Sequence, residues 1–418
     1  MCKRPLSQYA SNANERSKKK KEGAKAPLFP YLDTLVITLM QNFALKVLIF
    51  GLVKPFLTPP WGIFFCIPLL DIKKPICYND VATQSNVAYG SFFYMKQHNT
   101  YLDFCQPLND LRQNGKPQPW KEQKEQTALL AYAYGEILND AKASRVLTCA
   151  PRLSFSQKPD GRLKLENAVF CRVRLCPVCQ WRRSLKLFGQ TKQVIDEINK
   201  RQKTAFIMLT LTVKNVDGLD LSNEIDIIHS AWQRIMQRKE VKRAVLGWQR
   251  CLEVTHNVEF KSSSYNTFHP HIHALLCVRP SYFKSRDYIS REQWTQLWRE
   301  AARLDYDPQV WVSRVKDDHE GAVAEVTKYA SKPGDYLTAW DLDLMTESVE
   351  VLDSALHRRR LIAYGGIMKT IHKELGLDDV ENGDLVHTDN EEEKAEATAA
   401  LLHFEWVPGY RQYFKARE

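Results

Sequence analysis

The order of apolar patterns between residues 205 and 332 constrains the fold of this chain more than any other feature. Short apolar runs typical of strands alternate with segments whose apolar residues recur about every 3.6 positions, as in amphipathic helices. The expected strands cover residues 205–213, 249–255, 271–278 and 310–315, and the expected helices cover residues 225–236, 290–301 and 320–331. This order predicts an α+β protein with a ferredoxin-like βαββαβ antiparallel sheet and helices on one face. Because many functions use that layout, the function has to be argued from the side chains it displays.

The sharpest local signal is the sequence HPHIH in the third expected strand. Alternate residues of a strand face the same way, so His271 and His273 project together and could hold a divalent metal. Two histidines on an exposed edge strand are the alternative. Glu253 argues against that alternative, because it stands between apolar residues of the neighbouring strand, where an unpaired carboxylate would be costly. We predict a metal site of His271, His273 and Glu253, with His256 and His269 as rival third ligands.

The second signal is the sequence EVTKYASK near the end of the pattern. On a helix, the spacing places Glu325, Tyr329 and Lys332 along one stripe. Tyrosine can serve as a covalent nucleophile, but its ordinary pKa of about 10 makes the phenolate scarce at neutral pH. A metal at the scissile phosphate and a nearby lysine would both help, and Glu325 could act as general base for water. The alternative is an ordinary polar helix, but the metal pair and the tyrosine each supply what the other lacks.

Three cysteines with the spacing Cys171-x4-Cys176-x2-Cys179 form a separate candidate site. With Cys149 as the fourth ligand they would give a tetrahedral structural Zn²⁺ site, the alternative being reduced cysteines in a core. The other cysteines are scattered, which indicates a reducing cytoplasm rather than a secreted disulfide framework.

The basic charge balance of the chain suits a polyanionic partner. Lys and Arg number 59 against 49 Asp and Glu, a net charge of +10, which favours nucleic acid, although an anionic membrane surface would also fit. Arg182 and Arg183 follow the last clustered cysteine, beside an aromatic residue, and we predict that they contact the DNA backbone.

Taken together, these motifs resemble the plasmid rolling-circle replication initiators of the HUH endonuclease superfamily. The likeness is to the single-tyrosine group, in which a glutamate stands four residues before the nucleophile. Three motifs show the likeness, and they occur in the same order as in the family: FIMLTLT at 206–212, HPHIHALL at 269–276 and EVTKYASK at 325–332. With FCRVRLCPVCQWRRS at 170–184 and the segment 360–366, the likeness covers roughly residues 145–375. The joint match is far more specific than any one motif.

The resemblance implies a mechanism and partners. Tyr329 would form a 5′-phosphotyrosine link to nicked origin DNA and leave a 3′-hydroxyl that primes synthesis. Glu325 would activate water to end the round of replication. His271 and His273 would bind Mg²⁺ or Mn²⁺, with Glu253 as third ligand. The partners would be single-stranded or cruciform origin DNA, a host helicase and a host DNA polymerase, with no membrane.

Two other functions stay open at this point. A transposase or mobilisation relaxase of the same superfamily would share the chemistry, but the nearby second tyrosine, Tyr336, lies beyond Pro333 and Gly334, off the helix stripe. A non-catalytic, zinc-bearing DNA-binding regulator would make the histidine and tyrosine motifs coincidental, and changing Tyr329 would then alter nothing.

These features divide the chain into four parts. Residues 1–80 are an N-terminal extension, in which a membrane anchor over the apolar residues 35–53 is disfavoured by Lys46 and by nearby prolines. Residues 81–200 are a helical, Cys-rich region expected to hold the small zinc module, and residues 201–340 the HUH nuclease domain. Residues 341–418 are a C-terminal region with helical and acidic parts, in which we expect residues 378–400 to be solvated and mobile.

Overall fold

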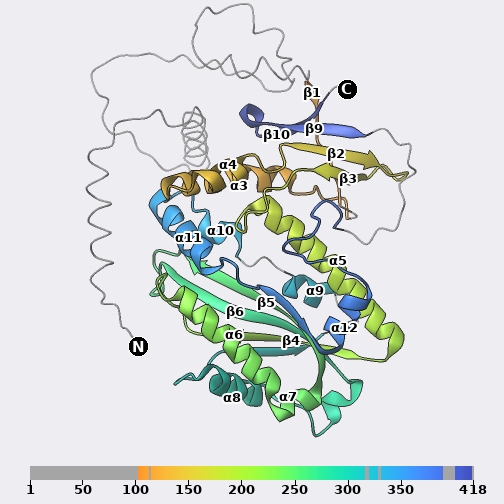
Figure 1. The fold of residues 1–418 in the computed structure, drawn as a ribbon, viewed down its shortest axis with the longest axis vertical. Helices are drawn as coiled ribbons and strands as arrows, with labels where there is room; N and C mark the ends of the chain where they lie inside the picture. Colours follow the sequence, from red (N-terminus) through yellow and green to blue (C-terminus); the bar gives the residue numbers. More distant parts are fainter. Residues whose placement is uncertain (1–101, 113, 316–319, 328–330, 389–400, 417–418) are drawn as a thin grey trace, which may run out of the picture. The chain divides into compact units, whose positions relative to one another are not determined.

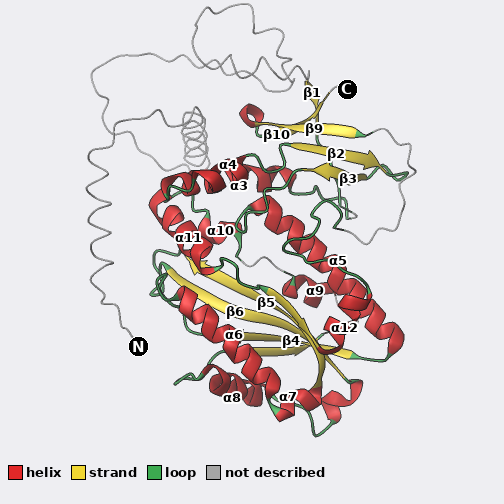
Figure 2. Cartoon of the chain, viewed as in Figure 1, coloured by secondary structure: helices red, strands yellow, loops and turns green. Residues whose placement is uncertain are grey.

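Two antiparallel five-stranded sheets and their surrounding helices make up the described part of the chain (Figure 1, Figure 2). The computed structural model describes residues 102–112, 114–315, 320–327, 331–388 and 401–416. The expected α+β class is therefore confirmed, whereas the sequence analysis predicted only one of the two sheets. The apolar segment 35–53, considered above as an anchor, lies outside the described residues.

The predicted sheet has the strand order β7-β4-β6-β5-β8, and every neighbouring pair is antiparallel. Its strands are β4 (Ala205–Thr212), β5 (Val245–Asn257), β6 (Thr267–Val278), β7 (Val310–Arg314) and β8 (Ile362–Gly365). The helices between them are α6 (Leu221–Gln237), α7 (Lys239–Ala244), η2 (Pro280–Lys284) and α8 (Arg291–Ala302). The chain order strand, helix, strand, strand, helix, strand agrees with the order of the apolar patterns.

Helices cover both faces of this sheet, not one. The alternation along β4 explains why, because Ile207, Leu209 and Leu211 join one core while Phe206 and Met208 join another. The first core includes the apolar stripe of α6 and two tryptophans of α8, whose N-terminus carries a capping box of Ser290 and Gln293. The second core is completed by α5 (Pro177–Arg201), α9 (Glu320–Val326) and α12 (Gly366–Glu374).

The second sheet joins segments from both ends of the described chain. Its order is β1-β10-β9-β2-β3, with β1 (Leu102–Pro107), β2 (Arg152–Gln157), β3 (Leu163–Ala168), β9 (Leu402–Val407) and β10 (Gln412–Ala416). The turn η3 (Pro408–Tyr410) joins β9 to β10. The Trp120 ring at the start of α3 (Trp120–Glu136) packs edge-on against Phe155 of β2 and Trp181 of α5. α5 therefore touches the core of this sheet near its N-terminus and the other sheet further along.

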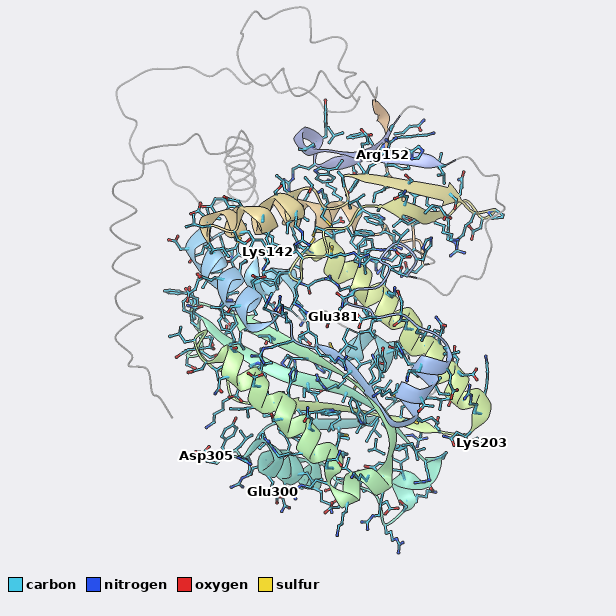
Figure 3. All side chains as sticks on the ribbon, in the orientation of Figure 1. Lys142, Arg152, Lys203, Glu300, Asp305 and Glu381 are labelled. Atoms are coloured by element: carbon cyan, nitrogen blue, oxygen red, sulfur yellow. The ribbon has the colours of Figure 1, made fainter. Side chains whose placement is uncertain are left out.

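The remaining helices connect the two regions. They are α4 (Asp140–Leu147), α10 (Pro333–Tyr336) and α11 (Leu342–Ala355). Asp353 on α11 accepts a 2.8 Å hydrogen bond from the Tyr134 hydroxyl of α3 and pairs with Lys142 of α4, which is labelled in Figure 3. One carboxylate therefore binds two helices of the region that carries the second sheet.

Candidate active site

Three predicted residues meet in the middle of the first-described sheet. In the pairing of β5 with β6, Glu253 lies directly opposite His271, and His273 lies one pair further along the same face. All three side chains are buried, and Glu253 is only 2% exposed. A carboxylate this deeply buried needs charged or hydrogen-bonding partners, and the two imidazoles supply them.

Both imidazoles direct Nε2 at the same carboxylate oxygen. Nε2 lies 3.5 Å from Glu253 Oε2 for His271 and 2.9 Å for His273. The other ring nitrogens are held in place: Nδ1 of His271 donates to the His269 carbonyl at 3.0 Å, and Nδ1 of His273 lies 3.1 Å from the Thr210 hydroxyl. This arrangement is the usual one for metal-ligating histidines, in which a bond at one nitrogen orients the other toward the ion.

The ligand atoms of Glu253, His271 and His273 lie within 4.8 Å of one another, so they can hold a metal ion together. Burial by itself raises the pKa of the Glu253 carboxyl, but hydrogen bonds from both imidazoles outweigh it and hold that pKa well below its ordinary value. A carboxylate and two imidazoles suit a divalent cation and leave coordination positions for water or a phosphate oxygen.

The two rival third ligands are placed differently. His256 faces the opposite side of the sheet from Glu253, because the two are three residues apart on one strand. Both of its ring nitrogens are engaged, Nε2 with Asn266 Oδ1 at 2.9 Å and Nδ1 with the Ser348 hydroxyl at 3.0 Å. His269 stacks on the His271 ring but is not one of the three residues whose ligand atoms converge.

Two members of the predicted tyrosine motif lie beside this cluster. Glu325 Oε1 is 3.8 Å from His273 Nδ1, and Lys332 Nζ is 3.3 Å from Glu253 Oε1. Burial lowers the pKa of the Lys332 ammonium, but the Glu253 carboxylate more than offsets it, so the pKa is raised. Tyr329 lies outside the described residues.

The helix that carries the motif is shorter than predicted. It ends at Val326 instead of continuing to residue 331, and the Thr327 hydroxyl donates to the Val323 carbonyl at 2.7 Å, so it satisfies one of the terminal acceptors of the helix. The Ser184 hydroxyl of α5 donates to the Thr327 carbonyl. Lys332 is the N-cap residue of α10, so it reaches the site from the next helix and not from the same stripe as Glu325.

The four predicted cysteines converge as expected for a single ion. Cys179 Sγ is 3.6 Å from the sulfurs of both Cys149 and Cys171, and all four sulfurs lie within 4.8 Å of one another. A tetrahedral site with Zn–S bonds of about 2.3 Å requires sulfurs about 3.8 Å apart, so the geometry fits zinc. Lys124, which the sequence analysis missed, also suits a zinc site. Its buried ammonium donates to the Cys149 carbonyl at 2.6 Å. Four thiolates around Zn²⁺ would carry a net negative charge, which the ammonium would offset.

Arg182 does not occupy the exposed position predicted for a DNA contact. Its side chain is 6% exposed and donates to the carbonyls of Leu385 and Val386 at 2.9 and 2.7 Å and to the Thr388 hydroxyl at 3.0 Å. A later segment of the chain covers the guanidinium, which argues against the predicted DNA contact and favours a role in stabilising the fold. Arg183 is half-buried and donates to the Arg172 carbonyl at 3.0 Å.

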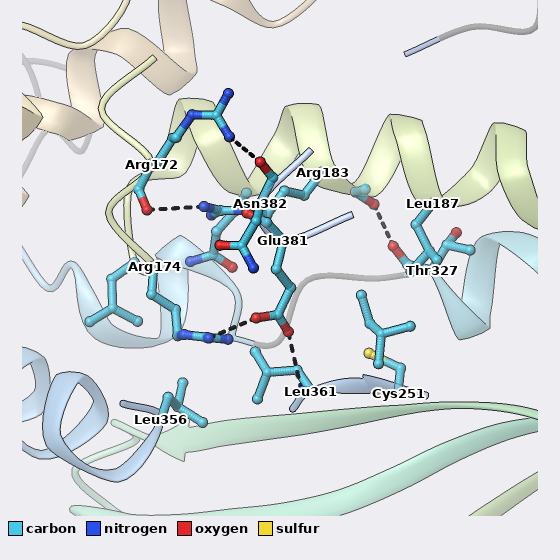
Figure 4. Close-up of a pocket in the computed structure, with 14 residues that line it drawn as sticks. Arg172, Arg174, Arg183, Leu187, Cys251, Thr327, Leu356, Leu361, Glu381 and Asn382 are labelled. Carbon is cyan, nitrogen blue, oxygen red and sulfur yellow. Dashed lines mark hydrogen bonds and ion pairs between the residues drawn. The ribbon is translucent and has the colours of Figure 1, made fainter. Parts of the chain in front are cut away.

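The covering segment, residues 378–388, was expected to be solvated and mobile. Instead Val380, Leu385 and Thr388 are buried, and its acidic groups pair with cations near α5. Arg174 pairs with Glu381 at 2.8 Å, and Arg172 donates to the Asn382 carbonyl at 2.6 Å. Both contacts are drawn as dashed lines in Figure 4. Residues 389–400 lie outside the described residues.

A pocket of about 110 Å³ opens between this segment and the sheet. Its lining includes Arg172, Arg174, Arg183, Glu381, Cys251 and Thr327 (Figure 4). The arginine charges there already have partners in Glu381 and in backbone carbonyls, so the pocket is a packing gap beside Thr327 and does not form a separate anion site.

Comparison with known proteins identifies the family. The model of a family described as replication protein, Rep_1, matches residues 162–414, which is more than half of the chain. The chain belongs to the Rep_1 family of replication proteins. No solved structure matches it.

Curated relatives support the same assignment. This replication protein is 40% identical over 332 residues to a "Protein rep" of Bacillus amyloliquefaciens, covering 73% of the chain and 96% of the relative. It is 39% identical over 317 residues to a "Protein rep" of Streptococcus pneumoniae serotype 2 strain D39, covering 73% and 95%. It is 40% identical over 234 residues to a "Replication protein" of Staphylococcus aureus, covering 54% and 97%.

Two further observations complete the description of this replication protein. Among its described residues, no helix is both long and apolar enough to cross a membrane. Thr210, which orients the His273 ring, was missed in the sequence analysis. The signal was present, because Thr210 and Thr212 alternate with apolar residues in FIMLTLT and must share the face of the paired histidines.

Proposed function

We propose that this replication protein is a plasmid rolling-circle initiator of the HUH endonuclease superfamily that nicks and rejoins origin DNA. The observation that carries the proposal is the convergence of Glu253, His271 and His273 with Glu325 and Lys332 on one sheet face. The ferredoxin-like reading of the sheet agrees with the strand order β7-β4-β6-β5 of the βαββαβ unit.

In this proposal, Tyr329 is the nucleophile. Its phenolic oxygen attacks the scissile phosphorus, the bond to the 3′ oxygen breaks, and the products are a 5′-phosphotyrosine and a free 3′-hydroxyl. His271, His273 and Glu253 would hold Mg²⁺ or Mn²⁺. Such an ion, when bound, would supply positive charge at the scissile phosphate.

Lys332 and Glu325 have complementary roles in the proposed reaction. The Lys332 ammonium lies 3.3 Å from Glu253, so it adds positive charge at the edge of the site where the transition state gains negative charge. The Glu325 side chain is 36% exposed, so water can reach it. As general base, Glu325 takes a proton from the water that later cleaves the phosphotyrosine.

A structural Zn²⁺ held by Cys149, Cys171, Cys176 and Cys179 completes the proposal. This zinc module would belong to residues 81–200, the nuclease domain to 201–340, and the remaining parts to 1–80 and 341–418. The half-buried Arg183 stays a proposed contact for the DNA backbone. A host helicase and DNA polymerase would extend the strand from the nick, in the cytoplasm.

The relaxase or transposase alternative finds less support. A two-tyrosine mechanism would need a second accessible phenol, but Tyr336 is 0% exposed and its hydroxyl donates to the Leu175 carbonyl at 2.6 Å. Among the described residues of the tyrosine motif and the helix after it, the burial of Tyr336 favours Glu325 as the group that ends the reaction.

The decisive test uses a labelled single-stranded oligonucleotide that carries the plasmid's nick site, with Mn²⁺ and a denaturing gel. We expect a covalent protein–DNA band with the wild type and with Glu325→Ala, and no such band with Tyr329→Phe. Tyr410→Phe, which changes an exposed tyrosine in the turn η3 between β9 and β10, is the matched control and should retain the band. Tight DNA binding without an adduct, with Mg²⁺ or Mn²⁺, would contradict the proposal and favour a non-catalytic zinc-bearing DNA-binding regulator.

A further inference from the structure

An exposed tryptophan lies on the same sheet face as the candidate metal site. Trp311 of the edge strand β7 is 59% exposed, a large apolar surface to leave in water. Its neighbours Val310 and Val312 point into the core on the other face, so Trp311 contributes little to that core. The Trp311 ring is therefore accessible to another molecule on the face that carries the candidate metal site.

The pairing register relates Trp311 to the site. Trp311 lies opposite Thr210, and Thr210 lies opposite His273, so the three side chains project from one face. Two strand spacings of about 4.8 Å place Trp311 roughly 10 Å from His273 along this row. A strand of DNA whose phosphate reaches the metal site could therefore bring a neighbouring base to the indole.

A cation supports the ring. The Arg291 guanidinium lies 4.9 Å from the Trp311 ring centre, and Arg291 Nε donates to the Val310 carbonyl at 2.9 Å. The hydrogen bond fixes the guanidinium against the ring, so the indole is held in place by an ordered neighbour. A rigid indole loses less conformational entropy when it stacks on a partner.

A second pair of the same kind stands at the same end of the sheet. Lys214, two residues beyond the end of β4, has its ammonium 4.0 Å from the centre of the Tyr306 ring, and its backbone N–H donates to the Tyr306 hydroxyl at 2.8 Å. Two aromatic rings, each with a cation beside it, therefore lie where β4 ends and β7 begins.

Resting on the proposed function, we propose that Trp311 stacks on an unpaired nucleobase of the single-stranded origin DNA, next to the nucleotide at the metal site. Arg291 and Lys214 then contact backbone phosphates. Stacking aromatics interleaved with cations are the usual means of holding single strands, because every base has a π face. A protein partner is disfavoured, since the other residue of β7 on this face is the polar, exposed Ser313 and an interface core needs apolar surroundings.

The test measures binding of a fluorescent single-stranded nick-site oligonucleotide by anisotropy, with wild type, Trp311→Ala, Trp311→Phe and Tyr410→Ala. The Tyr410 variant removes an exposed aromatic from the turn η3 between β9 and β10 and serves as control. We expect Trp311→Ala to weaken binding about 5- to 100-fold, with the phenylalanine variant and the control within about 3-fold of wild type. Unchanged thermal unfolding of Trp311→Ala shows that the fold is retained.

A scan of abasic nucleotides separates stacking from a general disturbance. At one position near the nick, removal of the base should weaken binding to the wild-type protein. The same abasic oligonucleotide should bind Trp311→Ala as well as the intact oligonucleotide does, because the stacking ring is already absent. Wild-type affinity of Trp311→Ala, or the same loss at every abasic position with both proteins, would overturn the proposal. A wild-type dimer that Trp311→Ala dissociates would also overturn it, by assigning the ring to a contact between copies.

The experiment distinguishes the nicking proposal from the stacking proposal, because anisotropy measures DNA binding and does not depend on cleavage. If no covalent adduct forms but Trp311→Ala still loses affinity at one base, the nicking proposal fails and the stacking proposal stands. If covalent adducts form but Trp311→Ala binds DNA with wild-type affinity, the stacking proposal fails and the nicking proposal stands.

Discussion

Replacing Arg182 by methionine tests whether this side chain stabilises the fold or contacts DNA. The guanidinium makes three hydrogen bonds to the segment 385–388 and lies about 5.5 Å from the rings of Trp120 and Trp181. Methionine keeps most of the apolar stem and removes the charge and the donors. The carbonyls of Leu385 and Val386 would then lose a charged donor inside the protein.

The expected cost follows from these contacts. Hydrogen bonds to a charged group contribute about 1.5–3 kcal/mol each, and each cation–π contact about 0.5–1 kcal/mol. The contacts share one side chain and are not additive, so we expect a loss of about 3 kcal/mol in the free energy of unfolding. With a urea m-value of about 3 kcal/mol/M, the unfolding midpoint should fall by about 1 M.

Urea unfolding followed by tryptophan fluorescence, paired with DNA binding of the folded protein, distinguishes the two roles. Lys192→Met, an exposed cation on the same helix, is the matched control and should change stability by less than about 0.5 kcal/mol. We expect Arg182→Met to be less stable and to bind DNA with wild-type affinity where it is folded. An unchanged urea midpoint together with lost DNA binding would refute the structural role and restore the DNA contact.

Two more predictions concern the zinc module and the backbone. Zinc analysis by mass spectrometry should find about one Zn²⁺ per wild-type chain and none in Cys176→Ala. Cys277→Ala, which changes a buried cysteine outside the cluster, is the control and should retain the zinc. Zinc in Cys176→Ala would refute the site. Gly366→Ala should lower the free energy of unfolding by about 2 kcal/mol or more, because its φ is +55° and a Cβ would lie 2.2 Å from the Leu246 carbonyl oxygen. Differential scanning calorimetry of both variants checks this prediction. Gly409→Ala, the control, should unfold like the wild type because nothing lies within 4 Å of the added Cβ.

The candidate metal site could be predicted because its information is local. Strand parity alone puts His271 and His273 on one face, and the buried position of Glu253 between apolar residues requires a partner on the adjacent strand. The same parity excludes His256, an inference that the sequence supported but that was not drawn. The length of the motif helix could not be predicted, since its end depends on the Thr327 hydroxyl and on contacts with α5.

The second sheet could not be predicted in this way. β2 and β3 form a hairpin, but β2 also pairs with β9, whose partner residues lie about 250 positions later in the sequence. The short strand β3, LKLENA, has a mixed polar pattern without a buried alternating face. Pairing over such a separation has no local signature, so neither the sheet nor its edges follow from periodicity.

The position of segment 378–388 changes where a DNA-binding surface can be sought. Its acidic groups and carbonyls bond to cations of the cysteine loop and of α5, which include Arg172, Arg174, Arg182, Arg183 and Lys186. Charge that looked available for phosphate in the sequence is largely used inside the fold. DNA contacts at the candidate site should therefore come mainly from cations outside this set, and Arg291, beside the exposed Trp311 ring on the β7 side, is the candidate that the stacking proposal names.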